Sequence, residues 1–260
     1  MTKAIILAAG QGTRLRPLTN DRPKCLVSLI GKPLLLRQVE TLNRQGVNDI
    51  HIATGYRADQ IEKLGFNTSF NDKYDKTNMV ESLFSAVEYI KSCKEDLIIA
   101  YGDIIYSDIN LNKLLNSDDE INLMIDQKWR DLWSLRLENP LEDAETLLIN
   151  EEGLITEIGK KPENYSQIQG QYTGLIKIRA DKIEGFISFY NSLEREAIYD
   201  GNNFENMYMT SFLQLLINDS WSVKATNVES GWLEIDTTED LMVYESMAKS
   251  GKLSDFIKLS

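Results

Sequence analysis

The first hundred residues alternate between short apolar segments and segments with helical periodicity. Residues 3–7 and 97–101 are runs of β-branched and aliphatic side chains, which are typical of buried parallel strands. Residues 48–54 alternate apolar and polar side chains, and a helix is expected to begin at about Pro33 and to end before Gly46. This order predicts an α/β fold with a doubly wound, mostly parallel sheet and helices on both faces.

A further helix is expected to begin near Asn78. Asn78 and Glu81 have the spacing of a capping box, in which each side chain bonds the other's backbone N–H. The apolar residues that follow recur on one helical face: Leu83, Phe84, Val87 and Ile90.

The rhythm changes after Asn116. The segments INLMID, TLLI, LITEIG and YTGLIKI are short strand candidates with few helices between them, so we expect a small mixed or antiparallel excursion. Helices are expected at about 180–192 and 204–217 and from Thr238, with strands at SVKATNV and GWLEID. There is no repeat or low-complexity linker, which favours a single domain over residues 1–260.

Charge is distributed unevenly along the chain. The formal net charge is −12, yet residues 13–38 hold six cationic side chains against one acidic side chain, that of Asp21. Nucleic acid is excluded as a partner, because a phosphate backbone is met by a broad basic face. A local basic cluster indicates instead a small polyanion held in a confined place. No apolar run approaches the roughly 18 residues of a membrane helix, so no membrane partner is expected.

Histidine and cysteine are scarce. The single histidine, His51, rules out a triad that depends on histidine and a zinc site with several histidines. The two cysteines, Cys25 and Cys93, lack metal-ligand spacing and are expected to be free, packed thiols, which indicates a reduced, cytoplasmic location. The chemistry must therefore use carboxylates, lysine, arginine and a hard metal ion.

A glycine-rich turn follows the first strand. Gly10 and Gly12 allow backbone N–H groups to converge on a phosphate without obstruction by Cβ atoms. The spacing matches neither a Walker loop nor the dinucleotide fingerprint GxGxxG. Arg14 and Lys24 frame the turn, and Pro23 fixes the chain just before the lysine.

LAAGQGTRLRPLTNDRPKCL resembles the signature of the nucleotidyltransferases that make nucleotide-activated sugars and polar head groups, GxGTRLxPLT followed by PK. The resemblance implies a nucleotide-binding, Rossmann-like α/β sheet. It also implies that Arg14 and Lys24 are catalytic, contacting the triphosphate and the transferring α-phosphate. The nucleotide-binding turn would comprise Leu7, Ala8, Ala9, Gly10, Gly12 and Thr13.

The reaction that this resemblance implies needs charge neutralisation more than proton transfer. An anionic phosphate or phosphonate oxygen attacks the α-phosphorus and pyrophosphate leaves, so no general base is required. The resemblance places two Mg²⁺-binding carboxylates at Asp103 and Asp236; the alternatives are a turn residue and a cap for the helix at Thr238. Lys160 resembles the lysine before proline that relatives use on the acceptor phosphate, or else belongs to a solvated loop.

Three further segments, KYDKTNMVESLFSA, GYRADQ and NFENMYM, resemble the branch that uses CTP on phosphocholine, aminoethylphosphonate or phosphoglutamine. The resemblance implies CTP and a small phosphorylated or phosphono acceptor as partners, and it leaves a homodimer open. A sugar-1-phosphate nucleotidyltransferase and a non-catalytic nucleotide-binding module are the alternatives. The residues expected near cytidine are Gly55, Tyr56, Asn78 and Ser82.

The segment KWRDLWSLRLENP interleaves two tryptophans with two arginines. Tryptophan faces can hold an ammonium group and arginines can bind a carboxylate, which favours a zwitterionic acceptor, phosphoglutamine above all. Simple packing of the tryptophans is the alternative. We expect a nucleotide-binding core at about 1–115 and 221–250 and an acceptor-binding part at about 116–220. The acceptor candidates besides Lys160 are Trp129, Arg130, Trp133, Arg136, Tyr172 and Glu205.

Overall fold

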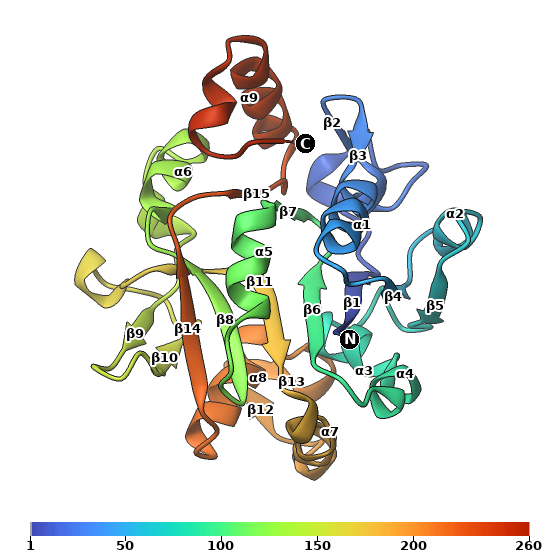
Figure 1. Ribbon diagram of the computed structural model, residues 1–260, viewed down its shortest axis with the longest axis vertical. Coiled ribbons are helices and arrows are strands. Elements are labelled where there is room, and N and C mark those ends of the chain that lie inside the picture. Colours follow the sequence, from blue (N-terminus) through green and yellow to red (C-terminus); the bar gives the residue numbers. More distant parts are fainter. Residues whose placement is uncertain (1, 260) are drawn as a thin grey trace.

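A seven-stranded sheet crosses the molecule in the order β14-β8-β11-β6-β1-β4-β5 (Figure 1). The computed structural model describes residues 2–259. All neighbours in the sheet are parallel except β11, which runs antiparallel to both β6 and β8. The predicted α/β fold with a mostly parallel sheet is confirmed. The strands are β1 Lys3–Ala8, β4 Asp49–Thr54, β5 Asn67–Phe70, β6 Leu97–Tyr101, β8 Ile121–Asp126, β11 Gln171–Ile178 and β14 Val223–Val228.

Helices cover both faces of the sheet (Figure 1). Alternate residues of a strand point to opposite faces, so β1 serves two cores. Its residues Ala4, Ile6 and Ala8 pack with α1, α5, α6 and α9, whereas Ile5 and Leu7 pack with α3, α4, α7 and α8. The helices are α1 Leu34–Arg44, α2 Ala58–Glu62, α3 Met79–Phe84, α4 Val87–Ser92, α5 Asp108–Leu115, α6 Trp129–Arg136, α7 Ile183–Ser192, α8 Met209–Asn218 and α9 Thr238–Lys249.

Short strand pairs complete the fold. Of the four segments predicted to form an excursion, two form a hairpin beside the sheet, β9 (Leu147–Ile149) with β10 (Ile155–Ile158), whereas β8 and β11 belong to the sheet itself. More important for the site, β15 (Trp232–Glu234) pairs antiparallel with β7 (Ile104–Tyr106). The N–H of Ile235 continues this ladder by donating to the carbonyl of Asp103 at 3.0 Å. The pairing therefore brings Asp236, which follows Ile235, beside Asp103, which lies just beyond the end of β6. Two further two-residue pairs are β2 Ser28–Leu29 with β3 Lys32–Pro33, and β12 Ile198–Tyr199 with β13 Asn202–Asn203.

The helix expected from Asn78 differs from its prediction in two respects. Asn78 does cap it, since its side chain accepts from the N–H of Met79, but neither of the two capping-box hydrogen bonds between Asn78 and Glu81 is formed. The carboxylate of Glu81 instead accepts a hydrogen bond from the hydroxyl of Tyr190 on α7. The helix also ends at Phe84, and a separate helix, α4, begins at Val87. The hydroxyl of Tyr190 has therefore replaced the backbone N–H of Asn78 as the partner of the Glu81 carboxylate.

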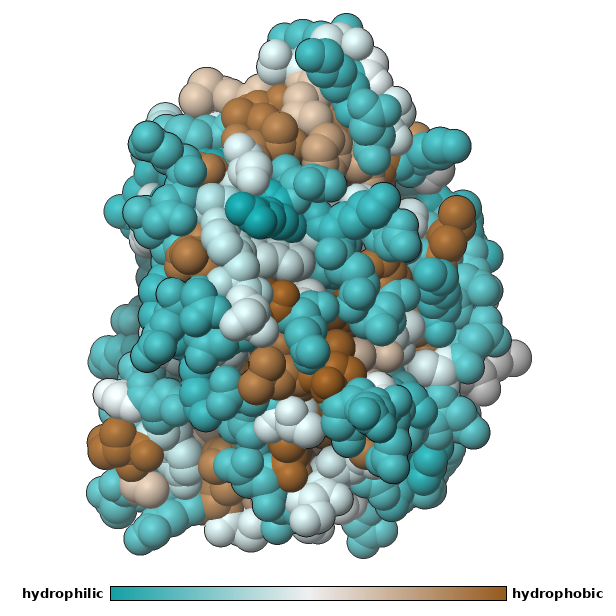
Figure 2. Space-filling model, turned by 90° about the vertical axis from the view of Figure 1, so that its left-hand side faces the viewer, coloured by the Kyte–Doolittle hydropathy of each residue, from teal (hydrophilic) through white to brown (hydrophobic). Residues whose placement is uncertain are grey.

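The face that shows α6, α9 and the β9–β10 hairpin is mostly hydrophilic, with separate hydrophobic areas (Figure 2). Within residues 2–259, no helix has the length and apolar character that crossing a membrane requires.

Candidate active site

The turn after β1 is shaped by Gly12. Its backbone has φ +64°, a conformation that favours glycine, and a Cβ atom there would lie 2.8 Å from Cβ of Lys24. Gly12 therefore permits the close approach of the lysine. The hydroxyl of Thr19 fixes the turn by donating to the Gly12 carbonyl at 2.7 Å. Gly10 has no atom within 4 Å of the position of its missing Cβ, so it leaves the cavity in front of the turn open.

Lys24 joins the two predicted metal-binding carboxylates. Its Nζ lies 2.7 Å from Oδ2 of Asp103 and 2.6 Å from Oδ1 of Asp236. The guanidinium of Arg14 lies 2.5 Å from the other oxygen of Asp236. Burial by itself lowers the pKa of Lys24, but the carboxylates of Asp103 and Asp236 outweigh it and raise the pKa above its ordinary value. Four residues predicted from three segments of the chain thus form one charged cluster.

The carboxylates of this cluster fit a divalent cation. Oδ1 of Asp103 is buried and accepts no hydrogen bond from the described residues. Two carboxylates that already converge on one ammonium group can converge on a hard cation, and Mg²⁺ is usually bound by one or two carboxylates plus substrate phosphates. No group of three or more potential metal-ligating side chains occurs in the described part of the chain. Asp103 and Asp236 would therefore hold Mg²⁺ together with phosphate oxygens and water.

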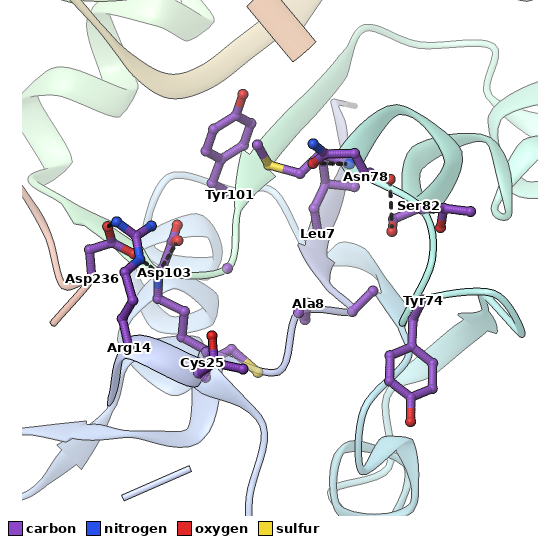
Figure 3. Close-up of a pocket in the computed structure, with 18 residues that line it drawn as sticks. Leu7, Ala8, Arg14, Cys25, Tyr74, Asn78, Ser82, Tyr101, Asp103 and Asp236 are labelled. Carbon is purple, nitrogen blue, oxygen red and sulfur yellow. Dashed lines mark hydrogen bonds and ion pairs between the residues drawn. The ribbon is translucent and has the colours of Figure 1, made fainter. Parts of the chain in front are cut away.

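A cavity of about 320 Å³ opens in front of the turn. Figure 3 shows Arg14, Asp103 and Asp236 on one side of it and Tyr74 and Asn78 on the other. The predicted residues that line it are Leu7, Ala8, Ala9, Gly10, Gly12, Thr13, Arg14, Lys24, Asn78, Ser82, Asp103 and Asp236. Sequence reasoning missed Cys25, Tyr74, Thr77, Met79, Tyr101 and Gly102.

Two residues expected near cytidine do not line this cavity. A Cβ atom on Gly55 would lie 2.5 Å from Cβ of Tyr74 and 2.7 Å from the Ala9 carbonyl, so Gly55 packs behind the cavity wall. Tyr56 donates its N–H to the same carbonyl at 3.0 Å and its hydroxyl to the carbonyl of Asn20 at 2.7 Å. Gly55 and Tyr56 therefore support the turn and position Tyr74. Tyr74 lines the cavity in their place.

The rest of that wall is held by a buried asparagine. The side-chain amide of Asn71 donates to the hydroxyls of Ser82 at 3.0 Å and Thr77 at 2.9 Å. This places both hydroxyl groups at the cavity beside Asn78, at the start of α3. Cys25 lines the cavity as well, but burial raises the pKa of its thiol to about 12, so it stays protonated and unreactive. Both cysteines are free and buried, as predicted.

A second cavity, of about 210 Å³, adjoins the first. The two share Arg14, Met79, Tyr101 and Asp236, so the charged cluster lies where they meet. Of the predicted acceptor residues, Trp133 and Tyr172 line the second cavity. Its other lining residues are Asp143, Glu145, Gln171, Thr173, Gly174, Tyr208, Met209, Thr210, Trp232 and Glu234.

Arg136 has an internal role that the sequence did not indicate. Its side chain is 5% exposed and donates to both oxygens of Asp240, at 2.8 and 3.1 Å, and to Glu234 at 2.8 Å. Asp240 in turn accepts from the backbone N–H groups of Asp236 and Thr237, both at 2.9 Å. Arg136 is thus fully occupied by internal carboxylates, and it anchors the segment that carries Asp236.

The other acceptor candidates lie outside both cavities. The ring of Trp129 is buried against Trp133, with the ring centroids 5.9 Å apart. The guanidinium of Arg130 lies 3.9 Å from the ring centroid of Tyr165. Lys160 and Glu205 form exposed ion pairs, with Glu157 at 2.6 Å and with Lys73 at 2.9 Å. The structure therefore does not bring Trp129, Arg130, Lys160 or Glu205 to the site.

Known proteins are similar to this chain in both sequence and architecture. Residues 4–121 match the model of the MobA-like NTP transferase domain. The chain is 45% identical over 248 residues to a CTP:phosphoglutamine cytidylyltransferase of Campylobacter jejuni, an alignment that covers 92% of this chain and 98% of the relative. It is also 41% identical over 119 residues to a choline-phosphate cytidylyltransferase of Streptococcus pneumoniae, covering 44% of this chain and 51% of that one.

Two solved structures have the same fold. The inositol-1-phosphate CTP transferase from T. maritima superimposes with a TM-score of 0.74 at 24% identity, covering 98% of this chain and 97% of that one. The CTP:phosphocholine cytidylyltransferase from Streptococcus pneumoniae has a TM-score of 0.68 at 25% identity, covering 95% and 99%. Together with the alignment over nearly the whole length of the Campylobacter protein, they confirm the predicted resemblance. The chain belongs to the MobA-like nucleotidyltransferase family.

Proposed function

We propose that this protein transfers CMP from CTP to the phosphate of a small amino-bearing acceptor of the phosphoglutamine type. An oxygen of the acceptor phosphate forms a bond to the α-phosphorus of CTP, the bond between the α-phosphorus and the bridging oxygen breaks, and pyrophosphate leaves. The observation that supports this proposal best is the junction of two cavities at Arg14 and Asp236. The 45% identity to a CTP:phosphoglutamine cytidylyltransferase supports the choice of nucleotide and acceptor.

The first cavity suits the nucleotide. Its glycine-rich turn offers backbone N–H groups to phosphates, and Lys24 and Arg14 offer positive charge at the end nearest the second cavity. Tyr74 and Asn78, at the opposite side, would contact the base. In this arrangement the two cations bind the transferring α-phosphate and offset the repulsion between the two anionic reactants.

Mg²⁺ is the proposed cofactor. Asp103 and Asp236 would hold the ion, which would supply positive charge for the triphosphate and its leaving group. The ammonium group of Lys24 would be available to the phosphate once these carboxylates bind the ion. No proton has to be removed, because the acceptor oxygen is already anionic.

The linings of the cavities support the proposed division of a single domain. All described lining residues of the first cavity fall within 7–103, apart from Asp236, whereas most of the second cavity comes from residues 133–210. These sets lie in the proposed nucleotide-binding core, about 1–115 and 221–250, and in the acceptor-binding part, about 116–220. The two parts share one sheet, because β11 and β8 belong to it.

A pyrophosphate-release assay tests the proposal. CTP, UTP, dTTP and ATP are each combined with phosphoglutamine, phosphocholine, 2-aminoethylphosphonate and glucose 1-phosphate, in the presence of Mg²⁺. We expect the highest kcat/KM for CTP with phosphoglutamine, and no release from Asp103→Asn. Preference for glucose 1-phosphate would indicate a sugar-1-phosphate nucleotidyltransferase instead. Nucleotide binding without any pyrophosphate release would indicate a non-catalytic module.

A further inference from the structure

We propose that Glu145 binds the ammonium group of the acceptor, so that the second cavity selects its substrate chiefly by that positive charge. This inference rests on the proposed function and adds to it the residue that determines specificity. It replaces Glu205, the acid that the sequence suggested for this role and that the structure places in an exposed ion pair with Lys73.

The charges of the second cavity lead to this assignment. Four acidic side chains line it, and Arg14 is the sole cation among its described lining residues. Arg14 is itself paired with Asp236, and Glu234 is paired with Arg136. The carboxylates of Glu145 and Asp143 make no ion pair or hydrogen bond with any described residue, but Asp143 is exposed whereas Glu145 is only partly exposed. The cavity therefore has an uncompensated negative charge at Glu145.

The position of Glu145 is fixed by its backbone. Its N–H donates to Oε1 of Gln171 at 3.0 Å, and Nε2 of Gln171 donates back to its carbonyl at 2.6 Å. Gln171 is buried at the start of β11. Burial, and then the charges of Asp143 and Glu234, raise the pKa of Glu145 to about 7. A bound cation would relieve this cost, which is a physical reason for an ammonium group to bind here.

Two side chains that line the cavity carry buried polar groups. Trp133 is 5% exposed and its indole N–H has no hydrogen-bond partner among the described residues. The hydroxyl of Tyr172 is buried as well, and the ring of Tyr172 lies edge-on to that of Tyr101, with the ring centroids 5.7 Å apart. Trp133 and Tyr172 line the cavity together with Trp232. Aromatic faces beside a carboxylate are a favourable environment for an ammonium group, and buried polar groups without partners need a ligand or water.

Arg14, the sole cation of the described lining, is paired with Asp236, so a carboxylate on the acceptor has no comparable free partner there. Arg136 is occupied by Asp240 and Glu234, and Arg130 lies outside the cavity over Tyr165. The indole N–H of Trp133 is a neutral donor. We therefore infer that removal of the α-carboxylate from a phosphoglutamine-type acceptor costs less than removal of the charge on its amino group.

The test combines Glu145→Gln with three acceptors: phosphoglutamine, its analogue without the α-carboxylate and its N-acetylated analogue. Glu145→Gln should raise the KM for phosphoglutamine about 10- to 100-fold, the usual effect of losing a charged hydrogen bond, and leave the KM for CTP unchanged. With the N-acetylated analogue, the variant and the wild type should have the same KM. Glu142→Gln, an exposed neighbour outside both cavities, is the matched control and should behave as the wild type.

An unchanged KM for phosphoglutamine in a folded Glu145→Gln protein would overturn the inference while leaving the proposed function intact. So would a wild type that uses the N-acetylated analogue as well as phosphoglutamine, a comparison that needs no variant to fold. If the wild type released no pyrophosphate from CTP with any of the amino-bearing acceptors, that result would contradict the proposed function itself.

Discussion

The ammonium nitrogen of Lys24 lies 2.6 Å from Oδ1 of Asp236, although 212 positions separate the two residues in the chain. The sheet explains the contact. Lys24 follows the turn after β1, Asp103 follows the adjacent parallel strand β6, and the β15–β7 ladder brings in Asp236. Ligands collect at the carboxyl ends of strands in open α/β sheets, and this cluster lies at that edge.

Removal of the charge on Lys24 should abolish turnover without unfolding the protein. Lys24→Met keeps the length and apolar stem of the side chain but loses the charge that faces the phosphates. We expect kcat to fall by about 10²- to 10³-fold or more, as when one transition-state donor is removed. Steady-state pyrophosphate release measures it. Lys63→Met, which removes an exposed lysine paired with Asp59, is the control, and a Lys24→Met rate close to that of the control would contradict the assigned role.

Asp103 and Asp236 should make nucleotide binding depend on Mg²⁺. In the wild type, calorimetry should show tighter CTP binding with Mg²⁺ than with a chelator. In Asp103→Asn this difference should disappear, because the side chain loses the negative charge that would hold the ion. A full Mg²⁺ effect in Asp103→Asn would place the metal elsewhere.

Arg136 should matter for stability more than for acceptor affinity. Arg136→Gln leaves Glu234 and Asp240 without their shared buried cation, a loss that typically costs about 3–5 kcal/mol. Urea unfolding measures this change. Arg130→Ala removes only an exposed contact with Tyr165 and should change the free energy of unfolding by less than about 1 kcal/mol. Equal stability of the two variants would refute the internal role of Arg136.

The raised pKa of Glu145 predicts how activity depends on pH. The carboxylate is mostly protonated below pH 7 and mostly charged above it. Since the charged form would bind the ammonium, kcat/KM for the amino-bearing acceptor should rise between about pH 6 and pH 8. The groups facing Glu145 are Asp143, Glu234, Tyr101 and Tyr172. In Glu145→Gln the rise should be lost, and its persistence would assign the titration to another group.

The same raised pKa predicts that stability depends on pH in the opposite direction to activity. As pH rises, activity should increase and the free energy of unfolding should decrease. Glu145 has a pKa of about 7 in the fold against an ordinary value of 4.5, so the folded protein binds more protons than the unfolded chain within that window. The free energy of unfolding contributed by this group therefore falls as pH rises from about 4.5 to 7. Glu145→Gln should be more stable than the wild type at pH 8, on the order of 1–2 kcal/mol, and the gain should shrink towards pH 5. A constant difference across this range would contradict the pKa assignment.

Local signals in the sequence were sufficient to predict the charged cluster but not the walls around it. Gly12, Arg14 and Lys24 lie in one short motif, and the two aspartates follow recognisable apolar segments. The strand β5, Asn67–Phe70, escaped prediction because it is a short edge strand without buried residues. The helix α5 was not predicted either.

The residues that sequence reasoning misjudged depend on distant partners. Glu81 looked like half of a capping box, but Tyr190 on α7 takes its carboxylate. Arg136 looked like a ligand-binding arginine, but Glu234 and Asp240 were unknown as neighbours. Glu145 ends the acidic run ENPLEDAE, and nothing local distinguishes it from Glu142. The helix α6 was not among the predicted helices, so the sequence could not show which of its side chains face the cavity.

A structure with a non-hydrolysable CTP analogue and Mg²⁺ bound tests the central claim most directly. We expect the α-phosphate within hydrogen-bond distance of Lys24 and Arg14, a metal ion held by Asp103 and Asp236, and the cytosine ring against Tyr74 and Asn78. A nucleotide bound outside this cavity, with Lys24 still joined to both aspartates, would contradict the account.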